Sequence, residues 1–238
     1  MLEVRSLHKS FRGLVAVNEL SFSVDKGSIG ALIGPNGAGK TTVFNLITGA
    51  LRPDRGQVLL DGKDITGRRP DQACRDGIGR TFQVAKPLND LTVEENVMIG
   101  ALRAARGVAE ARVEARRVLD LLAFGREATK PAHELTLPDR KRLEVAKALA
   151  TKPRILLLDE VMAGLRPTET DQMVEVFRRL NQETGLTILL IEHVMRAVMA
   201  LSGHVTVINY GSLIAEGPPD QVVRDQAVLD CYLGQEAE

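Results

Sequence analysis

The stretch Gly34-Pro35-Asn36-Gly37-Ala38-Gly39-Lys40-Thr41 matches the phosphate-binding loop pattern G-x-x-x-x-G-K-[ST] at every fixed position. The apolar run of residues 29–33 precedes this loop, and Val43, Leu46 and Ile47 follow it at helical spacing. These flanks predict a loop that joins a buried strand to a helix, which is the setting that the pattern requires. A glycine-rich turn that binds no ligand is the alternative interpretation.

The residues of the loop suit the binding of a polyphosphate. Glycines let successive backbone N–H groups approach an anion closely, and the start of the following helix adds the positive end of its dipole. Lys40 would reach the β- and γ-phosphates, and the Thr41 hydroxyl would ligate Mg²⁺. We expect the nucleotide to be held by the loop and the first helical residues, namely Asn36, Gly37, Ala38, Gly39, Lys40, Thr41 and Thr42.

Two carboxylates follow a second apolar run. Residues 155–158 are all Ile or Leu and lead directly into Asp159 and Glu160. This pattern predicts a buried parallel strand that delivers acidic groups to the carboxyl edge of a sheet, where ligands of open α/β sheets bind. Asp159 is then placed to hold Mg²⁺, directly or through water, and Glu160 to polarise an attacking water. The alternative is that these two acidic residues only lie at the start of a helix and have no role in a site.

Three further residues are candidates on weaker grounds. His193 follows the apolar run 186–191, so it is expected at the same edge, within reach of the γ-phosphate, although a purely structural histidine is the alternative. Phe11 has polar neighbours that favour exposure, and its ring could stack on adenine or close the edge of a sheet. Gln83, taken alone, is most simply a solvated residue near a strand end.

Residues 86–150 form a helical section between the phosphate-binding loop and the acidic strand. Thr92 begins its first helix with a capping box, and Val108 to Phe124 continue as a second helix with a narrow apolar face. Thr136 is the expected N-cap of the last helix, with Asp139 at its third position. The arginines of this section are interpreted as a solvated face.

The remaining segments complete an α/β pattern. Residues 2–30 alternate short apolar runs with turns and predict an antiparallel sheet. Residues 168–183 predict an amphipathic helix, residues 205–215 a closing hairpin, and the following residues a polar helix through Leu233.

Composition limits the class of protein. The 238 residues suffice for one substantial α/β domain with an insert, and the 31 basic and 31 acidic residues give no bulk electrostatic support for nucleic-acid binding. Cys74 and Cys231 are far apart and lack metal-ligand spacing, which favours a reducing cytosol. We recognise neither a signal peptide nor an apolar run long enough to cross a bilayer, so we expect a soluble chain.

Taken together, these motifs resemble those of an ATP-binding cassette (ABC) ATPase over nearly the whole chain. The motifs that occur in the order and rough spacing of that family are the loop at 34–41, Gln83, the helix start at 135–144, the strand end at 159–160 and His193. The ATPase subunits of bacterial branched-chain amino acid importers are the most similar subgroup. The stretches that resemble this subgroup are 80–83, 142–146, 163–165, 191–193 and Tyr232-Leu233-Gly234.

The resemblance implies a fold. Residues 1–238 are expected to form a single ABC ATPase domain with a P-loop NTPase (RecA-like) core. An N-terminal antiparallel β subdomain and an inserted α-helical subdomain at about residues 86–150 would complete it.

The resemblance also implies roles for single residues. ABC ATPases pair head to tail, so each ATP lies between the phosphate-binding loop of one subunit and the signature motif, here containing Thr136, of the other. An aromatic side chain at Phe11 stacks on adenine, Gln83 senses the Mg²⁺ site and faces the membrane partner, Glu160 matches the catalytic base, and His193 matches the switch histidine. Lys40, Mg²⁺ and the loop amides would stabilise the charge that develops as water attacks the γ-phosphorus.

The implied function is that of an energy-coupling subunit. ATP binding and hydrolysis would power solute import, of branched-chain amino acids or related small solutes, through membrane-embedded permease subunits. A second ABC ATPase, identical or different, would complete the dimer, and a solute-binding protein would take part indirectly. No nucleic-acid partner is expected. The chain would be cytoplasmic and peripherally attached to the inner face of the membrane.

Two other functions remain as alternatives. A soluble ABC clamp on DNA or ribosomes would be expected to carry a long coiled coil or two cassettes, and neither is recognisable here. An ATP-binding partner with weak hydrolysis is the other alternative.

Several positions depart from the family pattern. Residues 135–139 read Leu-Thr-Leu-Pro-Asp where the signature usually reads Leu-Ser-Gly-Gly-Gln. Pro138 offers no N–H to a γ-phosphate, and Asp139 places an anion near an anion. Val161 stands where a proline usually follows the glutamate, and Arg166 replaces the usual Asp or Asn. We expect an ATPase whose contacts across the dimer differ in detail, or one that needs a more typical partner cassette.

Overall fold

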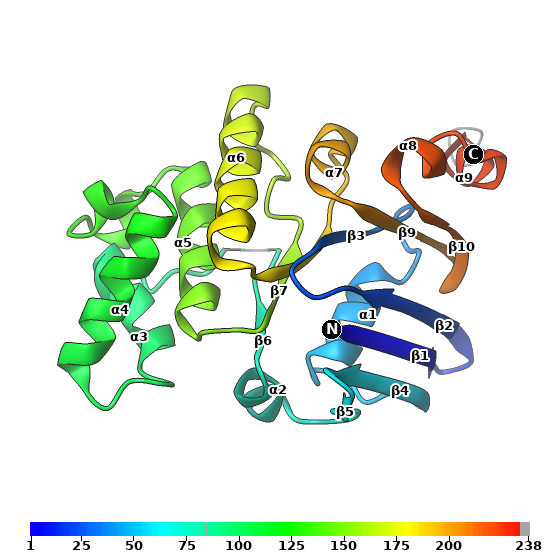
Figure 1. The fold of residues 1–238 in the computed structure, drawn as a ribbon, viewed down its shortest axis with the longest axis horizontal. Helices are drawn as coiled ribbons and strands as arrows, with labels where there is room; N and C mark the ends of the chain where they lie inside the picture. The colour runs from blue at the N-terminus through cyan, green and yellow to red at the C-terminus, as the bar shows by residue number, and fades with distance from the viewer. Residues whose placement is uncertain (84, 234–238) are drawn as a thin grey trace.

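The strands form two sheets within residues 1–83 and 85–233, which are the residues that the computed structural model describes (Figure 1). The larger sheet has the strand order β10-β9-β3-β8-β7-β6, in which β9, β3, β8, β7 and β6 run parallel and β10 is antiparallel to β9. Its strands are β3 (Ile29–Ile33), β6 (Ile78–Arg80), β7 (Ile155–Asp159), β8 (Thr187–Ile191), β9 (His204–Asn209) and β10 (Ser212–Gly217).

The parallel strands are continuous apolar runs because both faces of this sheet are covered. In β7, Ile155 and Leu157 pack into the apolar cluster on one face, while Leu156 and Leu158 pack into the cluster on the other. All four side chains are fully buried. A strand with one solvated face would instead alternate apolar and polar residues.

The smaller sheet is antiparallel, as the sequence predicts for the first 30 residues. Its order is β2 (Leu14–Val24), β1 (Leu2–Phe11), β4 (Arg55–Leu60) and β5 (Lys63–Asp64). Helix α1 (Lys40–Ile47) lies between the two sheets, and its buried side chains join both in one apolar cluster (Figure 1). The short helix α2 (Pro70–Asp76) leads into β6.

The segment between β6 and β7 contains the predicted helical section. It holds α3 (Val93–Ala101), α4 (Val108–Leu121) and α5 (Leu137–Ala150), with 3-10 turns at Gly125–Glu127 and Ala132–Glu134. These helices pack on one another at the end of the molecule farthest from the antiparallel sheet (Figure 1). Both predicted N-caps are confirmed, because Thr92 and Thr136 accept hydrogen bonds from the backbone N–H of Glu95 and Asp139.

The second predicted helix of this section is shorter than expected. It ends at Leu121 instead of Phe124, because Ala123 adopts a positive φ of 50°. The N–H of Ala123 donates to the Asp120 carbonyl and the N–H of Phe124 to the Leu119 carbonyl, which is the Schellman pattern that terminates helices. The motif usually has glycine at this position, so the sequence carries no visible stop signal.

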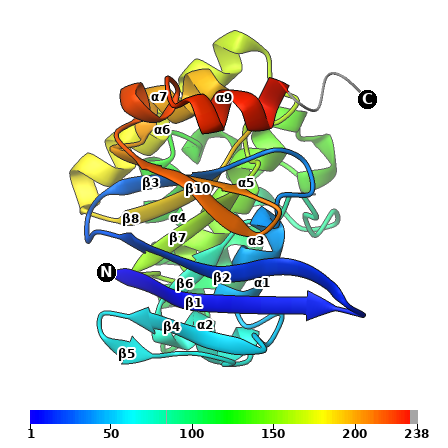
Figure 2. The ribbon, with the colours of Figure 1, turned by 90° about the vertical axis from the view of Figure 1, so that its right-hand side faces the viewer.

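The remaining helices cover the face of the parallel sheet opposite α1. They are α6 (Pro167–Thr184), α7 (Met195–Leu201), α8 (Pro219–Val222) and α9 (Gln226–Leu233), and Figure 2 shows α7 and α9 above β3 and β10. The predicted C-terminal helix is thus two helices. Gly234, part of the sequence resemblance, lies outside the described residues.

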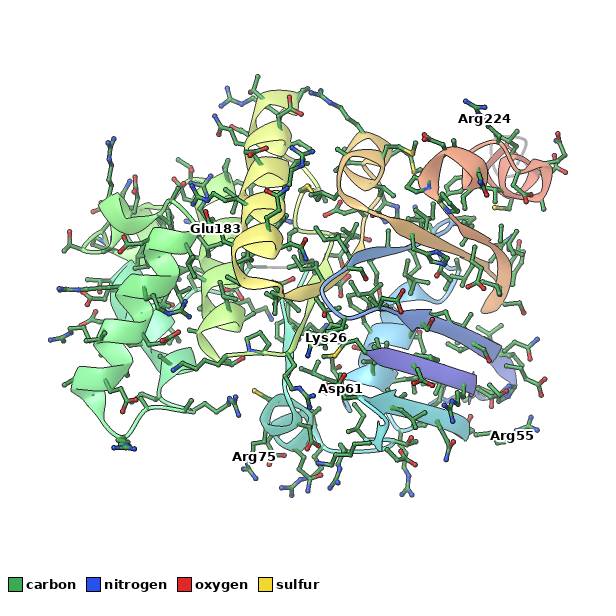
Figure 3. All side chains as sticks on the ribbon, in the orientation of Figure 1. Lys26, Arg55, Asp61, Arg75, Glu183 and Arg224 are labelled. Atoms are coloured by element: carbon green, nitrogen blue, oxygen red, sulfur yellow. The ribbon has the colours of Figure 1, made fainter. Side chains whose placement is uncertain are left out.

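Charged side chains lie on all sides of the molecule. Arg55, Arg75, Glu183 and Arg224 are exposed in parts of the fold that are far apart, and Figure 3 shows Arg55, Arg75 and Arg224 at the outline of the molecule. Among the described residues, no helix combines the length and apolar composition needed to cross a lipid bilayer.

We predict that Leu156→Ala destabilises the protein by roughly 2–5 kcal/mol, because it opens a cavity between the parallel sheet and its helices. Leu156 is 0% exposed. Urea unfolding followed by circular dichroism measures the change. The exposed Leu213 on the edge strand β10 supplies the control, since Leu213→Ala should cost less than about 1 kcal/mol. Equal losses in both variants would contradict the assigned burial.

Candidate functional site

The phosphate-binding loop turns from β3 into α1 and contains two glycines, Gly34 and Gly39, whose positions leave no space for a side chain. A Cβ at Gly34 would overlap the carbonyl oxygen of Ile208, and one at Gly39 would overlap that of Ala16. Gly39 also has a φ of 102°, in the left-handed region that favours glycine. The loop therefore lies flat against β9 and β2 and presents the first turn of α1 to an anion.

Lys40 lies inside this loop. Its ammonium group donates to the carbonyl oxygens of Gly34 and Pro35, at 2.7 and 2.8 Å, and the residue is only 6% exposed. Burial lowers the pKa of Lys40, while the negative charges of Glu160 and Asp159 act in the opposite direction. The sequence therefore places a cation where the phosphates of a nucleotide would lie.

A cavity of about 290 Å³ adjoins the loop. It is lined by Leu14, Val15, Ala16, Asn36, Gly37, Ala38, Gly39, Lys40, Thr41, Thr42, Glu160 and Tyr210. The structure thus brings together all seven loop residues that the sequence selects. Phe11 is exposed at the end of β1 and does not line this cavity, although its cross-strand partner Leu14 does. The Lys9 ammonium lies 5.5 Å from the Phe11 ring centroid.

Asp159 ends β7 at the same edge of the sheet and is almost fully buried. One carboxylate oxygen, Oδ2, accepts a hydrogen bond of 2.8 Å from the Arg80 guanidinium. The other, Oδ1, is buried and has no hydrogen-bond partner among the described residues. A buried carboxylate oxygen without a partner is costly, so this atom is available to accept a bond from a ligand.

Arg80 is a site residue that the sequence reasoning did not select. From the end of β6 it also donates to Asn45 Oδ1 at 2.6 Å and to Thr48 Oγ1 at 3.2 Å, both on or next to α1. Its guanidinium carbon lies 5.3 Å from the ring centroid of Phe82. Arg80 therefore links α1 to the end of β7 through hydrogen bonds. Nothing in the sequence around Arg80 indicates this contact, because the pairing of β6 with β7 is known only from the structure.

Glu160 connects three segments that are far apart in sequence. Its Oε1 lies 2.6 Å from His193 Nε2, and its Oε2 accepts a hydrogen bond of 2.6 Å from Gln83 Nε2. The backbone of Glu160 has a positive φ of 50°, and its N–H donates to the Ile191 carbonyl. A non-glycine residue in this conformation indicates a backbone held by its surroundings, as is common at functional sites.

Two buried ionisable residues near Glu160, Lys141 and Glu192, were also not selected from the sequence as site residues. Lys141 on α5 donates to the backbone carbonyl of Glu160 at 2.9 Å. Glu192, at the end of β8, accepts from the N–H of Met162 at 2.8 Å, and its second carboxylate oxygen is buried without a partner in the described part of the chain. Burial raises the pKa of Glu192 to about 7, partly offset by the Met162 N–H and the Lys141 charge. Glu192 follows an apolar run, but nothing in the sequence around it reveals that its carboxylate is buried.

Thr136 lies at a separate place. It caps α5, and its hydroxyl donates to the Asp139 carboxylate at 2.6 Å. It is not among the residues that line the phosphate-loop cavity. Gly164, in the loop after β7, lies beside Leu137 at the start of the same helix.

A second hollow, of about 720 Å³, lies beside the site. We call it the β6–α3 groove. It is lined by Thr41, Arg80, Phe82, Gln83, Lys86, Leu88, Asn96, Ile99, Gly100, Glu144, Lys147, Ala148, Thr151 and Asp159. Phe82 and Ile99 are 61% and 48% exposed, which is unusual for such large apolar side chains. Gln83 and Asp159 belong to both this groove and the site, so the two are contiguous.

Comparison with known proteins gives consistent results. The profile of a family described as ABC transporter matches residues 17–163, and that of a family described as branched-chain amino acid ATP-binding cassette transporter matches residues 212–238. The high-affinity branched-chain amino acid transport ATP-binding protein BraF of Pseudomonas aeruginosa is 38% identical over 99% of this chain and 98% of its own length. LivG of Escherichia coli, described in the same words, has the same identity and coverage.

Solved structures agree with the sequence comparison. A nucleotide-free ATP-binding cassette from an ABC transporter superimposes with a TM-score of 0.89 at 32% identity, over 98% of both chains. The ADP conformation of an ATP-binding cassette of an ABC transporter gives the same values. The match extends over both sheets and the helical section.

We predict that Glu192→Gln flattens the dependence of stability on pH. The carboxyl pKa rises from 4.5 to about 7 on folding, so the folded state keeps a proton that the unfolded state has lost. Stability therefore falls as the pH rises through this window, by about 3 kcal/mol. Glutamine carries no charge and can still accept from Met162. Urea unfolding at pH 5 and pH 8 measures this effect.

The exposed Glu183 on α6 supplies the control for this experiment. Glu183→Gln should leave the pH dependence as it is in the wild type. The assignment of Glu192 would be wrong if Glu192→Gln showed the same pH dependence as the other two proteins.

Proposed function

The chain belongs to the ABC transporter family of ATP-binding proteins, and from this premise we propose that it powers the import of branched-chain amino acids or related small solutes. As a member of this family it is an ATPase. One observation supports the proposal most strongly. At one edge of the parallel sheet, Glu160 contacts both His193 and Gln83 and lies beside the phosphate-binding loop. The relatives are transport proteins, which favours this function over a clamp on DNA or ribosomes.

In the proposed mechanism the loop amides and the start of α1 hold the phosphates of ATP. Lys40 exchanges its hydrogen bonds with the Gly34 and Pro35 carbonyls for bonds to the β- and γ-phosphates. Because these groups are fixed before the reaction, they stabilise the charge that develops on the phosphoryl oxygens without reorganisation. This assignment rests on geometry and on the loop pattern together.

The residues present fit a Mg²⁺ ion. Asp159 Oδ1 is a buried oxygen in need of a partner, Thr41 offers a hydroxyl, and Gln83 binds Glu160 through its nitrogen, which leaves its oxygen for a cation. Oxygen ligands of this kind are those that Mg²⁺ prefers. When bound, the ion supplies charge neutralisation for the β- and γ-phosphates. Asp159, Thr41 and Gln83 are thus the proposed ligands.

Glu160 is the proposed general base. Its carboxylate lines the cavity next to the loop and is held from two sides by His193 and Gln83, so its orientation is fixed. In this position it accepts a proton from the water that attacks the γ-phosphorus. His193 then orients Glu160 and lies near the γ-phosphate, while Phe11 is the proposed stacking partner of the adenine.

A second ATPase subunit completes the proposed site. Thr136 and the start of α5 lie outside the cavity of their own subunit, so they would act on the nucleotide of a partner, either a copy of this chain or a related cassette. The Thr136 hydroxyl already donates to Asp139, and Asp139 adds a negative charge near the incoming phosphate. The Thr136 hydroxyl would have to exchange its bond to Asp139 for one to the γ-phosphate, so the attraction would rest mainly on the α5 dipole.

The β6–α3 groove is the proposed docking surface for a membrane-embedded permease. Its exposed apolar residues Phe82, Leu88 and Ile99 form the kind of patch that marks a protein interface. The groove shares Gln83 with the nucleotide site, so a change at Mg²⁺ and Glu160 would reach the permease directly. The chain would then sit on the cytoplasmic face of the membrane, and a solute-binding protein would act through the permease.

We predict that Glu160→Gln lowers ATP turnover by at least about 100-fold, because the general base is lost. Binding of ATP should persist and trap an ATP-bound dimer, seen by size-exclusion chromatography with Mg-ATP. Phosphate release measures turnover, and Glu183→Gln is the matched control. Unchanged turnover in Glu160→Gln would remove the residue from its proposed role.

We also predict that cells lacking this chain lose uptake of labelled leucine, isoleucine and valine, and that the wild-type gene restores it. Lys40→Ala should fail to restore uptake, because the phosphates lose their cation. Lys26→Ala should restore it, since Lys26 lies in a cleft at the opposite edge of the sheet (Figure 3). Full uptake with Lys40→Ala, or unchanged uptake in the deletion strain, would refute a role of this chain in the import of branched-chain amino acids.

A further inference from the structure

Tyr210 occupies an unusual position in the turn between β9 and β10. Asn209 pairs with Ser212, so Tyr210 and Gly211 form a two-residue hairpin turn. Their φ angles are 46° and 77°, the positive pair that a type I′ turn requires. Such turns favour Asn, Asp or Gly at the first position, whereas a bulky residue with positive φ is an outlier. Tyr210 therefore occupies a position whose backbone conformation does not favour a tyrosine.

The turn is fixed against the phosphate-binding loop. The N–H of Gly211 donates to the Ala38 carbonyl, and the Gly211 carbonyl accepts from the N–H of Asn18 on β2, each at 2.9 Å. The Asn18 side chain also donates to the Ser212 hydroxyl at 3.2 Å. A side chain at Gly211 would overlap the backbone of Ala16 and Val17, so the turn packs as closely as backbones allow. The position of Tyr210 is therefore set relative to the loop.

Tyr210 lines the cavity beside the phosphate-binding loop and is not buried in a protein core. Tyr210 is 77% exposed and lines the 290 Å³ cavity together with Leu14, which is 73% exposed, and Val15. The phosphate-loop side of the same cavity is built from backbone amides and Lys40. The cavity therefore has a cationic, polar side and an apolar side, which matches a molecule with a polyphosphate joined to a nucleoside.

From this arrangement we infer that Tyr210 is a nucleotide-contacting residue, which packs its ring against the base and ribose of ATP. The inference rests on the proposed ATP site and adds to it a contact from a second hairpin. Phe11 and Leu14 belong to the β1–β2 hairpin, while Tyr210 comes from β9–β10, so the nucleoside would be held from both hairpins. Strain at an exposed aromatic residue beside a ligand cavity is typical of a functional position.

The test measures Kd by isothermal titration calorimetry for two ligands, Mg-ATP and inorganic tripolyphosphate. Removal of an aromatic packing partner should weaken ATP binding by about three- to tenfold in Tyr210→Ala and Tyr210→Asn. Asparagine suits the left-handed turn, so Tyr210→Asn removes the ring while keeping the backbone conformation. Tyr210→Phe should bind ATP like the wild type, because it keeps the ring. All Tyr210 variants should bind tripolyphosphate unchanged.

Lys40→Ala serves as the reference, since it should weaken binding of both ligands. The inference would be overturned if Tyr210→Ala and Tyr210→Asn bound ATP as the wild type does. It would also be overturned if both variants bound ATP and tripolyphosphate more weakly by the same factor, because the substitutions would then disturb the phosphate-binding loop itself. If the wild-type protein bound neither ligand, the proposed function itself would be wrong. This outcome differs from a failure of the Tyr210 inference alone, in which the wild-type protein still binds ATP.

Discussion

The register between β7 and β8 is the constraint on which the site depends. Asp159 pairs with Ile191 in this parallel ladder, so the two strands end side by side and the residues that follow them meet. Glu160 and His193 are brought within 2.6 Å of each other for this reason, although they are 33 positions apart. A slip of one residue would turn the side chains of a strand to the opposite face of the sheet. The pairing register of β7 and β8 therefore also fixes how close Glu160 and His193 lie to each other.

Much of this arrangement could be predicted from the sequence because its signals are local. The phosphate-binding loop is a contiguous motif, the buried strands are uninterrupted apolar runs, and Thr92 and Thr136 cap their helices through residues three positions away. Asp159 and Glu160 could be placed because a strand end at a parallel sheet defines an edge. The fold class and the residues around the loop follow from such signals.

The contacts that were missed are those that depend on tertiary packing. Arg80 reaches Asp159 across 79 positions, and Lys141 reaches the Glu160 carbonyl from another helix, so neither has a signature in its own neighbourhood. Glu192 is unusual only because it is buried, which its sequence neighbours do not reveal. Tyr210 stands out only once its positive φ and its place beside the loop are known. The candidate nucleotide-binding and catalytic residues could thus be predicted from sequence motifs, whereas the tertiary contacts that support them could not.

The central claim is that this ATPase drives a membrane-embedded partner through the β6–α3 groove. Affinity purification from detergent-solubilised membranes of its own source, with mass spectrometry of every co-purifying protein, tests it directly. Multi-span membrane proteins should be recovered with the wild type and with Val113→Asp, a change on the exposed face of α4, but they should be lost with Ile99→Asp. Recovery of only soluble partners, such as ribosomal proteins, or equal recovery with Ile99→Asp, would contradict it.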